Sequence, residues 1–149
     1  MSDQKQDHTA MDLAMAVRRL DLMMSQMHLE MSARLGLSAA ELLALAHLSL
    51  DGPLGPTDLT RRLHMTTGAM TAMLDRLAER DYVVREPHET DRRRIVVRLT
   101  TSGRDRIFTQ VHGMAASVVA ASRRLDAEQR RIVADYIEEI AGVVSAPVE

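Results

Sequence analysis

The chain has 149 residues, of which 46% are hydrophobic and 27% are charged, and it contains no cysteine. This composition predicts one globular domain, and the lack of cysteine excludes disulfides, thiolate nucleophiles and cysteine-ligated zinc. The polar start of the chain lacks the apolar core of a signal peptide, and no apolar run approaches the ~20 residues that span a bilayer. We therefore expect a cytoplasmic protein that has no membrane partner.

Basic residues concentrate in the middle third of the chain. Residues 53–104 contain ten arginines and seven acidic residues, whereas residues 1–52 and 105–149 carry net charges of −3 and −2. A local basic segment is the electrostatic signature of a protein that binds a polyanion, although an ordinary solvated surface is the alternative. The two tyrosines and one phenylalanine are too few for the stacking platforms that most single-strand nucleic-acid binders use.

The first predicted element is a long amphipathic helix. Leucine, valine and methionine recur at intervals of three or four residues from Leu13 to Leu35, and Gly36 ends the pattern. Additional methionines widen the apolar surface, which is typical of a helix that is buried on more than one side. In a small protein the second side is often covered by a partner chain, so residues 1–37 are predicted to form a dimerisation helix.

The next segment predicts a helix-turn-helix. Ser38 and Glu41 have the spacing of a capping box, which starts a helix that continues to Leu50. Pro56 or Thr57 opens a short helix, and after a brief turn Thr66 caps a helix over about 67–80. The buried face of this last helix is predicted to consist of Met70, Met73, Leu74 and Leu77. Two short helices joined by so few residues are typical of DNA-binding proteins.

A β-hairpin follows the two helices. The segments 82–85 and 95–99 have strand composition, and the polar loop Glu86–Arg94 between them has three adjacent arginines. Glu86, Glu89 and Asp91 lie among the arginines of the wing and are expected to be ion-pair partners. A helix over about 101–122 and a last helix capped by Asp126 complete the chain.

These elements predict a mainly α-helical winged helix-turn-helix with a small β-wing. We divide its one compact domain into an N-terminal dimerisation helix at 1–37, a DNA-binding region at 38–100 and C-terminal dimerisation helices at 101–149. Within the DNA-binding region, the recognition helix covers about 67–80 and the wing about 82–99.

A winged helix suits double-stranded DNA, because its second helix fits the major groove and its hairpin reaches the backbone or minor groove. The small residues at the start of the recognition helix suit close approach to base edges. The residues predicted to lie on DNA from this helix are Thr66, Thr67, Gly68, Ala69, Thr71, Ala72 and Arg76. Those predicted to contact DNA from the wing and its flanks are Arg80, Arg85, Arg92, Arg93 and Arg94.

The segment from Gly52 to Gly103 resembles the MarR family of bacterial transcription regulators. The matching pieces, in order, are Asp58–Leu63, Met65–Thr71, Leu74–Leu77 and Asp91–Thr100. The resemblance implies a homodimeric regulator, usually a repressor, that binds an inverted-repeat operator and is released by a small lipophilic or phenolic ligand. Two positions depart from the family pattern. Asp81 replaces a glycine that follows the recognition helix, and Gly55 replaces a serine or threonine beside the first short strand.

The resemblance also places Arg93 in the minor groove, where a narrow groove concentrates negative potential. It puts a wing arginine against Asp75, and this predicts an Asp75–Arg93 ion pair that orients the arginine. The alternative is that Asp75 pairs with Arg76 or Arg80 on its own helix.

Three further hypotheses concern ligands and chemistry. Arg18, His28 and His47 are candidate polar contacts for the effector, and a metal-responsive regulator that uses His28, His47 and His112 is an alternative. The chain lacks the common nucleotide-binding, hydrolase and zinc-protease motifs, so we expect no catalysis, no cofactor and no resident metal. A winged helix that serves protein–protein contacts is the remaining alternative.

Overall fold

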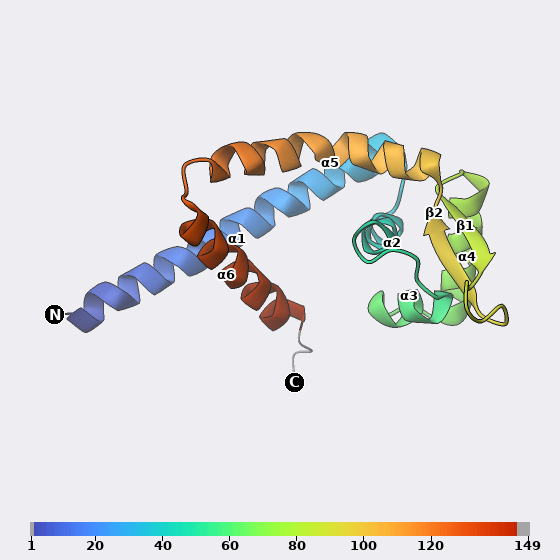
Figure 1. Ribbon diagram of the computed structural model, residues 1–149, viewed down its shortest axis with the longest axis horizontal. Coiled ribbons are helices and arrows are strands. Elements are labelled where there is room, and N and C mark those ends of the chain that lie inside the picture. The colour runs from blue at the N-terminus through green and yellow to red at the C-terminus, as the bar shows by residue number, and fades with distance from the viewer. Residues whose placement is uncertain (1, 146–149) are drawn as a thin grey trace. The chain divides into compact units, whose positions relative to one another are not determined.

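The computed structural model describes residues 2–145 and the side chains of residues 9–144. Its elements, coloured along the chain in Figure 1, are α1 (Ser2–Leu35), α2 (Ala39–Leu50), α3 (Pro56–Arg62), α4 (Thr67–Glu79), β1 (Val83–Pro87), β2 (Ile95–Leu99), α5 (Thr101–Ser122) and α6 (Ala127–Ser145). The chain forms two compact units that divide within α5, the first ending at Ile107 and the second beginning at Phe108. The predicted mainly helical architecture with a two-stranded wing is confirmed, and the terminal residues 1 and 146–149 of the predicted dimerisation regions lie outside the described residues.

Local sequence signals determine where the first helices end and begin. α1 ends at Gly36, which adopts the left-handed φ of +60° that few other residues tolerate. The capping box at the start of α2 is present: the Glu41 amide donates to Ser38 Oγ over 3.2 Å, and the Ser38 amide donates to Glu41 Oε2 over 2.8 Å. These bonds satisfy amides that a helix start leaves without partners.

The predicted helix-turn-helix is formed by α3 and α4. Pro56 occupies the first position of α3, where its missing amide proton costs nothing, and Thr66 Oγ1 caps α4 by accepting from the Ala69 amide over 3.3 Å. The predicted inner face of α4 is buried, since each of its four side chains is at most 1% exposed: Met70, Met73, Leu74 and Leu77. Leu45 and Leu59 add fully buried side chains from α2 and α3 to this core.

The hairpin pairs β1 with β2 in antiparallel register from Val83–Leu99 to Pro87–Ile95. The loop is two residues shorter than predicted, because β1 continues to Pro87 at the end of the ladder, where a residue without an amide proton is tolerated. The first short strand of the sheet is reduced to a single bridge between Leu54 and Val97, with N–O distances of 3.1 and 2.8 Å. This reduction accompanies the departure from the family pattern at Gly55.

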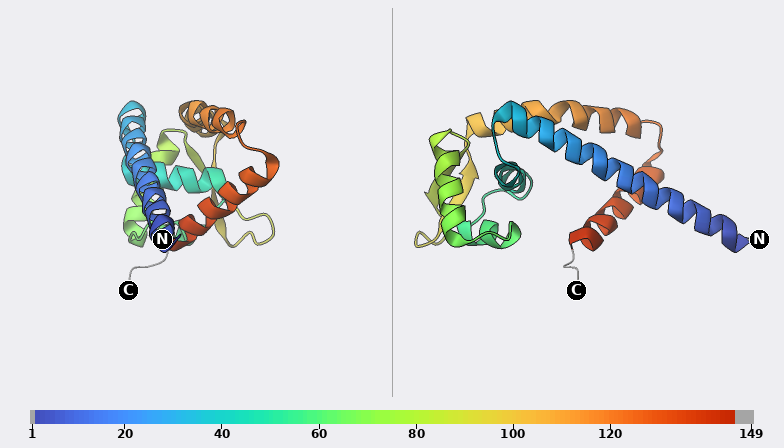
Figure 2. Two further views of the ribbon diagram at one scale, coloured as in Figure 1. Left: turned by 90° about the vertical axis from the view of Figure 1, so that its left-hand side faces the viewer. Right: turned by 180° about the vertical axis from the view of Figure 1, so that it is seen from behind.

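β1 runs beside α4 in the opposite direction. The Tyr82 amide donates to the Leu77 carbonyl over 2.9 Å, and further along β1 the Arg85 guanidinium reaches the Thr71 carbonyl. The hairpin loop therefore lies at the end of the unit where α4 begins, as Figures 1 and 2 show. This arrangement brings the first turns of α4 and the arginines of the loop to the same end of the first unit.

α1 has many exposed apolar side chains along its length. Those at least 50% exposed are Met11, Met15, Leu20, Leu22, Met23 and Leu29.

Within the described part of the chain, no single helix has both the length and the apolar content to cross a membrane. Thr9–Leu35 and Ala39–Leu50 meet that criterion only when taken together, and they form a pair bent by 101°.

The second unit contains the rest of α5 and α6. Asp126 and Gln129 form the predicted capping box of α6, with amide donor distances of 3.0 Å to Gln129 Oε1 and 2.8 Å to Asp126 Oδ1. The apolar stripe of α6 is exposed in the chain, and Ile137 is 56% and Val144 is 76% accessible. The helix thus presents an apolar surface that the described chain does not cover.

Candidate nucleic-acid interface

The first two turns of α4 present a face of small uncharged residues. The exposed positions on these turns and at the cap are Thr66, Thr67, Gly68, Ala69, Thr71 and Ala72. The Thr71 hydroxyl donates to the Thr67 carbonyl over 3.0 Å, which leaves its methyl group and lone pairs exposed. Hydroxyls and methyl groups can approach base edges and thymine methyls closely. These six of the seven residues predicted on this helix are accessible, and their contact with DNA stays a prediction.

The predicted Asp75–Arg93 ion pair is wrong in this structure. Asp75 Oδ1 accepts from Arg85 Nη1 over 2.6 Å, and Arg85 Nη2 also donates to the Thr71 carbonyl over 3.2 Å. The alternative of a local pair with Arg76 or Arg80 is not seen either. The physical reason is the strand direction, because Arg85 lies in the middle of β1 beside α4, whereas Arg93 lies in the hairpin loop beyond the last paired residues.

A double-mutant cycle can measure this pair. Asp75→Ala and Arg85→Ala are expected to show a coupling of about 0.5–1 kcal/mol in the free energy of unfolding, because their side chains are only 50% and 34% exposed and are in direct contact. Urea unfolding of the two single variants and the double variant gives the coupling. The cycle of Asp75→Ala with Arg93→Ala is the matched comparison and should be additive within error; the reverse pattern would restore the original pairing.

The hairpin loop is held in shape mainly by its own polar groups. The His88 amide donates to the Arg94 carbonyl over 2.8 Å, and the Arg94 amide donates to the Asp91 carbonyl over 2.9 Å. Asp91 Oδ1 accepts from the Arg93 amide over 3.1 Å, so Asp91 shapes the turn and its carboxylate is not used in an ion pair with a loop arginine. The side chains of Arg92, Arg93 and Arg94 are exposed on this turn.

The other two carboxylates of the hairpin are ion-paired, as predicted, but their partner is Arg98 on β2. Arg98 Nε lies 3.1 Å from Glu86 Oε2, and Arg98 Nη2 lies 3.5 Å from Glu89 Oε1. One strand arginine therefore neutralises both carboxylates. The three loop arginines are consequently left to present their positive charge at the tip.

Two predicted DNA contacts on α4 instead bind other parts of the first unit. Arg76 Nε donates to Glu41 Oε1 over 3.2 Å, and Arg80 donates to the carbonyls of Leu35 and Gly36. The structure thus gives Arg76 and Arg80 intramolecular partners, and their contact with DNA stays a prediction.

Glu41 is the only charged side chain among the buried residues described, at 6% exposure. Burial raises the pKa of this carboxyl, but the Ser38 amide and hydroxyl and the Arg76 guanidinium together lower the pKa below its ordinary value of 4.5. The ionised form is therefore the one that the fold stabilises.

Replacing Glu41 with glutamine should lower the free energy of unfolding by ~1–3 kcal/mol at pH 7, because charged hydrogen bonds to a buried acceptor are lost. A lowered pKa in the folded state gives stability that is complete above the unfolded pKa and is lost as pH falls through the folded pKa. The difference between wild type and Glu41→Gln should therefore be constant from pH 5 to 7 and shrink below about pH 4.5. Urea unfolding at several pH values measures it, and a difference that grows on acidification would contradict the assignment.

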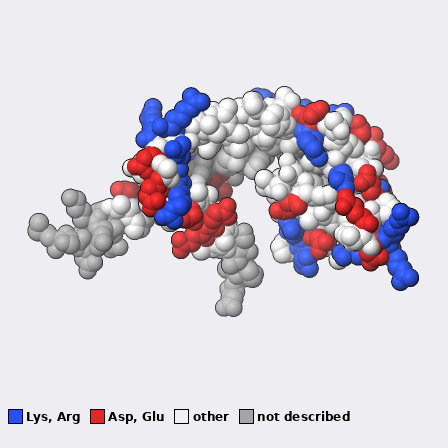
Figure 3. Space-filling model, in the orientation of Figure 1, with Lys and Arg blue, Asp and Glu red and all other residues white. Residues whose placement is uncertain are grey.

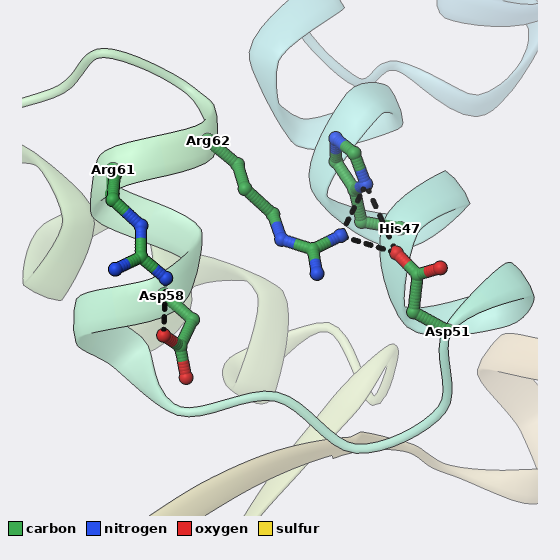
Figure 4. A network of polar contacts seen from close by, with 5 residues as sticks. All are labelled: His47, Asp51, Asp58, Arg61 and Arg62. Atoms are coloured by element: carbon green, nitrogen blue, oxygen red, sulfur yellow. Dashed lines mark hydrogen bonds and ion pairs between the residues drawn. The ribbon is translucent and has the colours of Figure 1, made fainter. Parts of the chain in front are cut away.

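α3 is tied to the end of α2 by a polar network (Figure 4). Arg62 Nη1 donates to Asp51 Oδ2 and lies 3.2 Å from His47 Nδ1, which is itself 3.3 Å from Asp51 Oδ2. His47 and Arg62 lower the pKa of the Asp51 carboxyl. Beside this network, Arg61 Nη2 lies 2.8 Å from Asp58 Oδ1. His47, predicted as a ligand contact, is thus engaged in the network that joins α2 to α3.

Figure 3 shows basic side chains gathered at the hairpin-loop end of the first unit, on the face that it draws. This end also presents the start of α4, as described above. An uncharged helix face thus lies next to a cluster of guanidinium groups. In protein–DNA complexes, phosphate contacts position the protein and base contacts specify the sequence, so this end of the unit carries groups suited to both kinds of contact.

The known sequences and structures agree with this geometry. The MarR family profile matches residues 35–94, which contain the start of α2 through the hairpin loop. The HTH-type transcriptional regulator YcgE of Bacillus subtilis, itself uncharacterised, is 26% identical over 122 residues, which cover 82% of this chain and 79% of YcgE. Over its helix-turn-helix and hairpin loop, the chain is therefore similar to the transcriptional regulators of the MarR family.

Solved structures share the fold of this chain. A variant of MepR from S. aureus superposes with a TM-score of 0.71 at 16% identity, covering 88% of this chain and 96% of MepR. A variant of E. coli MarR in complex with operator DNA gives a TM-score of 0.54 at 22% identity, covering 86% of this chain and 92% of MarR. The winged helix-turn-helix fold with N- and C-terminal helices is therefore that of the family.

The departure from the MarR-family pattern at Asp81 has a simple structural basis. Asp81 adopts a φ of +57°, the left-handed conformation that the usual glycine adopts without strain. Aspartate is among the few other residues that tolerate this conformation. The sharp turn between α4 and β1 is thus retained without glycine.

Among the described residues, the structure does not bring the predicted effector contacts or the three candidate metal-binding histidines together into a site. Arg18 and His28 are exposed on α1, and their role as ligand contacts stays a prediction. His112 lies against the ring of Phe108, with centroids 4.9 Å apart. No group of three or more His, Cys, Asp or Glu side chains that could hold a metal occurs among the described residues.

Sequence reasoning missed several residues that shape the interface. Arg98 holds two wing carboxylates, Arg62 and Asp51 join α3 to α2, and Glu41 anchors Arg76. Alternation along β2 puts Arg98 on the same face as the buried Val96, so the pattern of that strand gave no signal for its role. The contacts of Arg62 and Arg76 cross 11 and 35 residues of chain, so no local spacing indicates them.

Proposed function

We propose that this chain is a MarR-family repressor that binds an inverted-repeat operator as a homodimer. Each subunit inserts the first two turns of α4 into the major groove and lays the hairpin loop on the adjacent backbone and minor groove. The observation that carries the proposal is the location of an uncharged, exposed helix start and three exposed arginines at one end of the same unit. The E. coli MarR variant solved with operator DNA supports the choice of ligand.

The charge arrangement supports specific binding to duplex DNA. Asp75 is the acidic side chain closest in sequence to the base-reading turns, and Arg85 compensates its charge over 2.6 Å. Arg98 compensates Glu86 in the same way. Asp75 and Glu86 are thus neutralised, so they do not repel phosphate while the loop arginines attract it.

The exposed apolar helices support a homodimer. Leu29 on α1 and Val143 on α6 are each 71% exposed, and further large apolar side chains on both helices are similarly accessible. A single chain that exposes this much apolar surface on long helices is typical of a subunit whose helices pack against a partner. Two-fold symmetry would then present two α4 helices to major grooves about 10 bp apart, which requires an inverted repeat.

Selection of bound duplexes from a random pool tests the operator, and sedimentation tests the oligomer. We expect an enriched inverted repeat with half-sites centred about one helical turn apart, and a stable dimer at micromolar concentration. Enrichment of a single asymmetric site together with a monomer would overturn the dimeric proposal. Absence of any enriched duplex would favour the alternative that the winged helix binds a protein.

A further inference from the structure

Arg80 joins the end of the recognition helix to the end of α1. This residue is the C-cap of α4, and its Nη1 donates to the Gly36 carbonyl over 2.8 Å while its Nη2 donates to the Leu35 carbonyl over 2.6 Å. The last carbonyls of a helix have no partner within the helix and lie at the negative end of its dipole. A planar guanidinium with parallel donors fits two consecutive carbonyls, so Arg80 completes the cap of α1 from 44 residues away.

The backbone at the end of α1 is shaped to receive this arginine. Gly36 has a φ of +60°, and the Leu37 amide closes the helix end by donating to the Ser32 carbonyl over 3.1 Å. The Ser32 hydroxyl bonds the Leu37 carbonyl. The carbonyls of Leu35 and Gly36 are thereby held in place for an external donor.

A second arginine of α4 binds the same region. Arg76 lies one turn before Arg80 and reaches Glu41, whose other oxygen holds the Ser38 amide over 2.8 Å. We use "α1–α2 junction" for residues 35–41. Two guanidinium groups on successive turns therefore bind the α1–α2 junction. Arg80 binds it through backbone carbonyls, and Arg76 binds it through the buried carboxylate of Glu41.

Arg80 is also held from its other side. The Tyr82 ring, which is 2% exposed, lies 5.4 Å from the Arg80 guanidinium and 5.0 Å from that of Arg106. Arg106 Nη1 donates to the Arg80 carbonyl over 3.1 Å. With two carbonyls and an aromatic face as partners, the guanidinium would have to give up these contacts before it could reach a phosphate.

We propose that Arg80, assisted by Arg76, is a positioning residue that sets the orientation of α4 relative to the α1–α2 junction, and that it does not contact phosphate. The inference rests on the proposed function of α4 as the DNA-reading helix. Arg80 binds the junction at the last turn of α4, whereas the residues proposed to contact bases lie in the first two turns. The two ends are about 16 Å apart at 1.5 Å per residue. A small rotation of α4 relative to the junction therefore displaces the first two turns of the helix. This displacement would make DNA affinity depend on the position of α1.

The salt dependence of DNA binding separates a positioning arginine from a phosphate contact. A phosphate contact releases counterions, so its loss weakens all duplexes alike and lowers the slope of log K against log salt by about one. A positioning residue leaves the slope unchanged and mainly reduces the preference for the operator. Arg92→Ala is the matched control, because Arg92 lies exposed on the hairpin loop.

We would measure binding of wild type, Arg80→Ala, Arg80→Lys and Arg92→Ala to the selected operator and to a scrambled duplex between 50 and 200 mM KCl, concentrations within the range where such slopes are ~linear. Arg80→Ala should lose about tenfold or more on the operator, less on the scrambled duplex, with the wild-type slope. Arg80→Lys should recover part of the operator preference, because an ammonium can still donate to one carbonyl. Arg92→Ala should weaken both duplexes and lower the slope.

Glu41→Gln decides the question if Arg80→Ala is poorly folded. This variant removes a negative charge and frees Arg76, so a phosphate-contact role predicts unchanged or tighter binding, whereas the positioning role predicts weaker operator preference. An Arg80→Ala slope reduced by one, with equal loss on both duplexes, would overturn the inference and leave the proposed function intact. Salt-independent binding or no binding by the wild-type protein would instead overturn the proposed function.

Discussion

Gly103→Ala is expected to lower the free energy of unfolding by at least ~2 kcal/mol. A Cβ at Gly103 would lie 2.2 Å from the Tyr82 carbonyl oxygen and 2.8 Å from its carbonyl carbon, distances that backbone atoms cannot accommodate without moving. That carbonyl is in use, because it accepts from the Thr100 amide over 3.0 Å. The start of α5 would have to separate from the turn that leads into β1, and the wing would lose its support.

Gly113→Ala on the same helix is the matched control for Gly103→Ala. A Cβ at Gly113 meets no atom within 4 Å, so alanine should stabilise α5 by about 0.5–1 kcal/mol through its better helix propensity. Urea unfolding of both variants gives the two changes. Equal stabilisation at both positions would show that the close approach of α5 to Tyr82 does not exist in solution.

Ala72→Glu is expected to abolish operator binding, with a loss of about 100-fold or more, equivalent to ~2.7 kcal/mol. Ala72 is exposed on the second turn of α4, within the face that we place against base edges. A glutamate there adds bulk where the groove requires close approach and adds a charge that phosphates repel. The folded stability should be almost unchanged, because the position is exposed and glutamate is a good helix former. A fluorescence-anisotropy titration with the selected operator measures the loss.

Ala78→Glu carries the same substitution on the last turn of α4 and is the control for Ala72→Glu. The neighbouring Glu79 already places an exposed carboxylate on this turn, so another carboxylate should change affinity by less than about fivefold. Equal losses at both positions would indicate a general charge effect, and the assignment of the reading face to the first two turns would fail.

Elements with local signals could be predicted from sequence. The start of α2 rests on Ser38 and Glu41, and that of α6 rests on Asp126 and Gln129, pairs that are three residues apart and that bond as expected. The inner face of α4 follows from its helical period, and Asp81 takes the left-handed conformation that its place after the helix requires. Each of these features depends on contacts within a few residues of chain.

Side-chain pairing between elements could not be predicted in the same way. Whether Asp75 meets Arg85 or Arg93 depends on the direction of β1 along α4 and on where the hairpin turns, which composition does not determine. The bond from Arg80 to Gly36 crosses 44 residues. An arginine on a recognition helix looks like a phosphate contact in sequence, because nothing nearby reveals that its partners are carbonyls at the end of another helix.

The corrected contacts change the expected division of labour among the arginines. Arg76, Arg80 and Arg85 each bind a partner within the first unit, while Arg92, Arg93 and Arg94 are exposed on the hairpin loop. Phosphate and minor-groove contacts are thus expected from the loop, and the arginines of α4 and β1 are expected to keep the reading helix in position.

Methylation interference on the selected operator tests the central claim most directly, because one reagent modifies guanine N7 in the major groove and adenine N3 in the minor groove. If α4 reads the major groove and the hairpin loop enters the minor groove, guanine methylation should block binding in two clusters about 10 bp apart. Adenine methylation should block binding next to each cluster, and Arg93→Ala should remove only the adenine effect. Interference at adenines alone, with free binding to operators methylated at every guanine of the half-sites, would contradict the account.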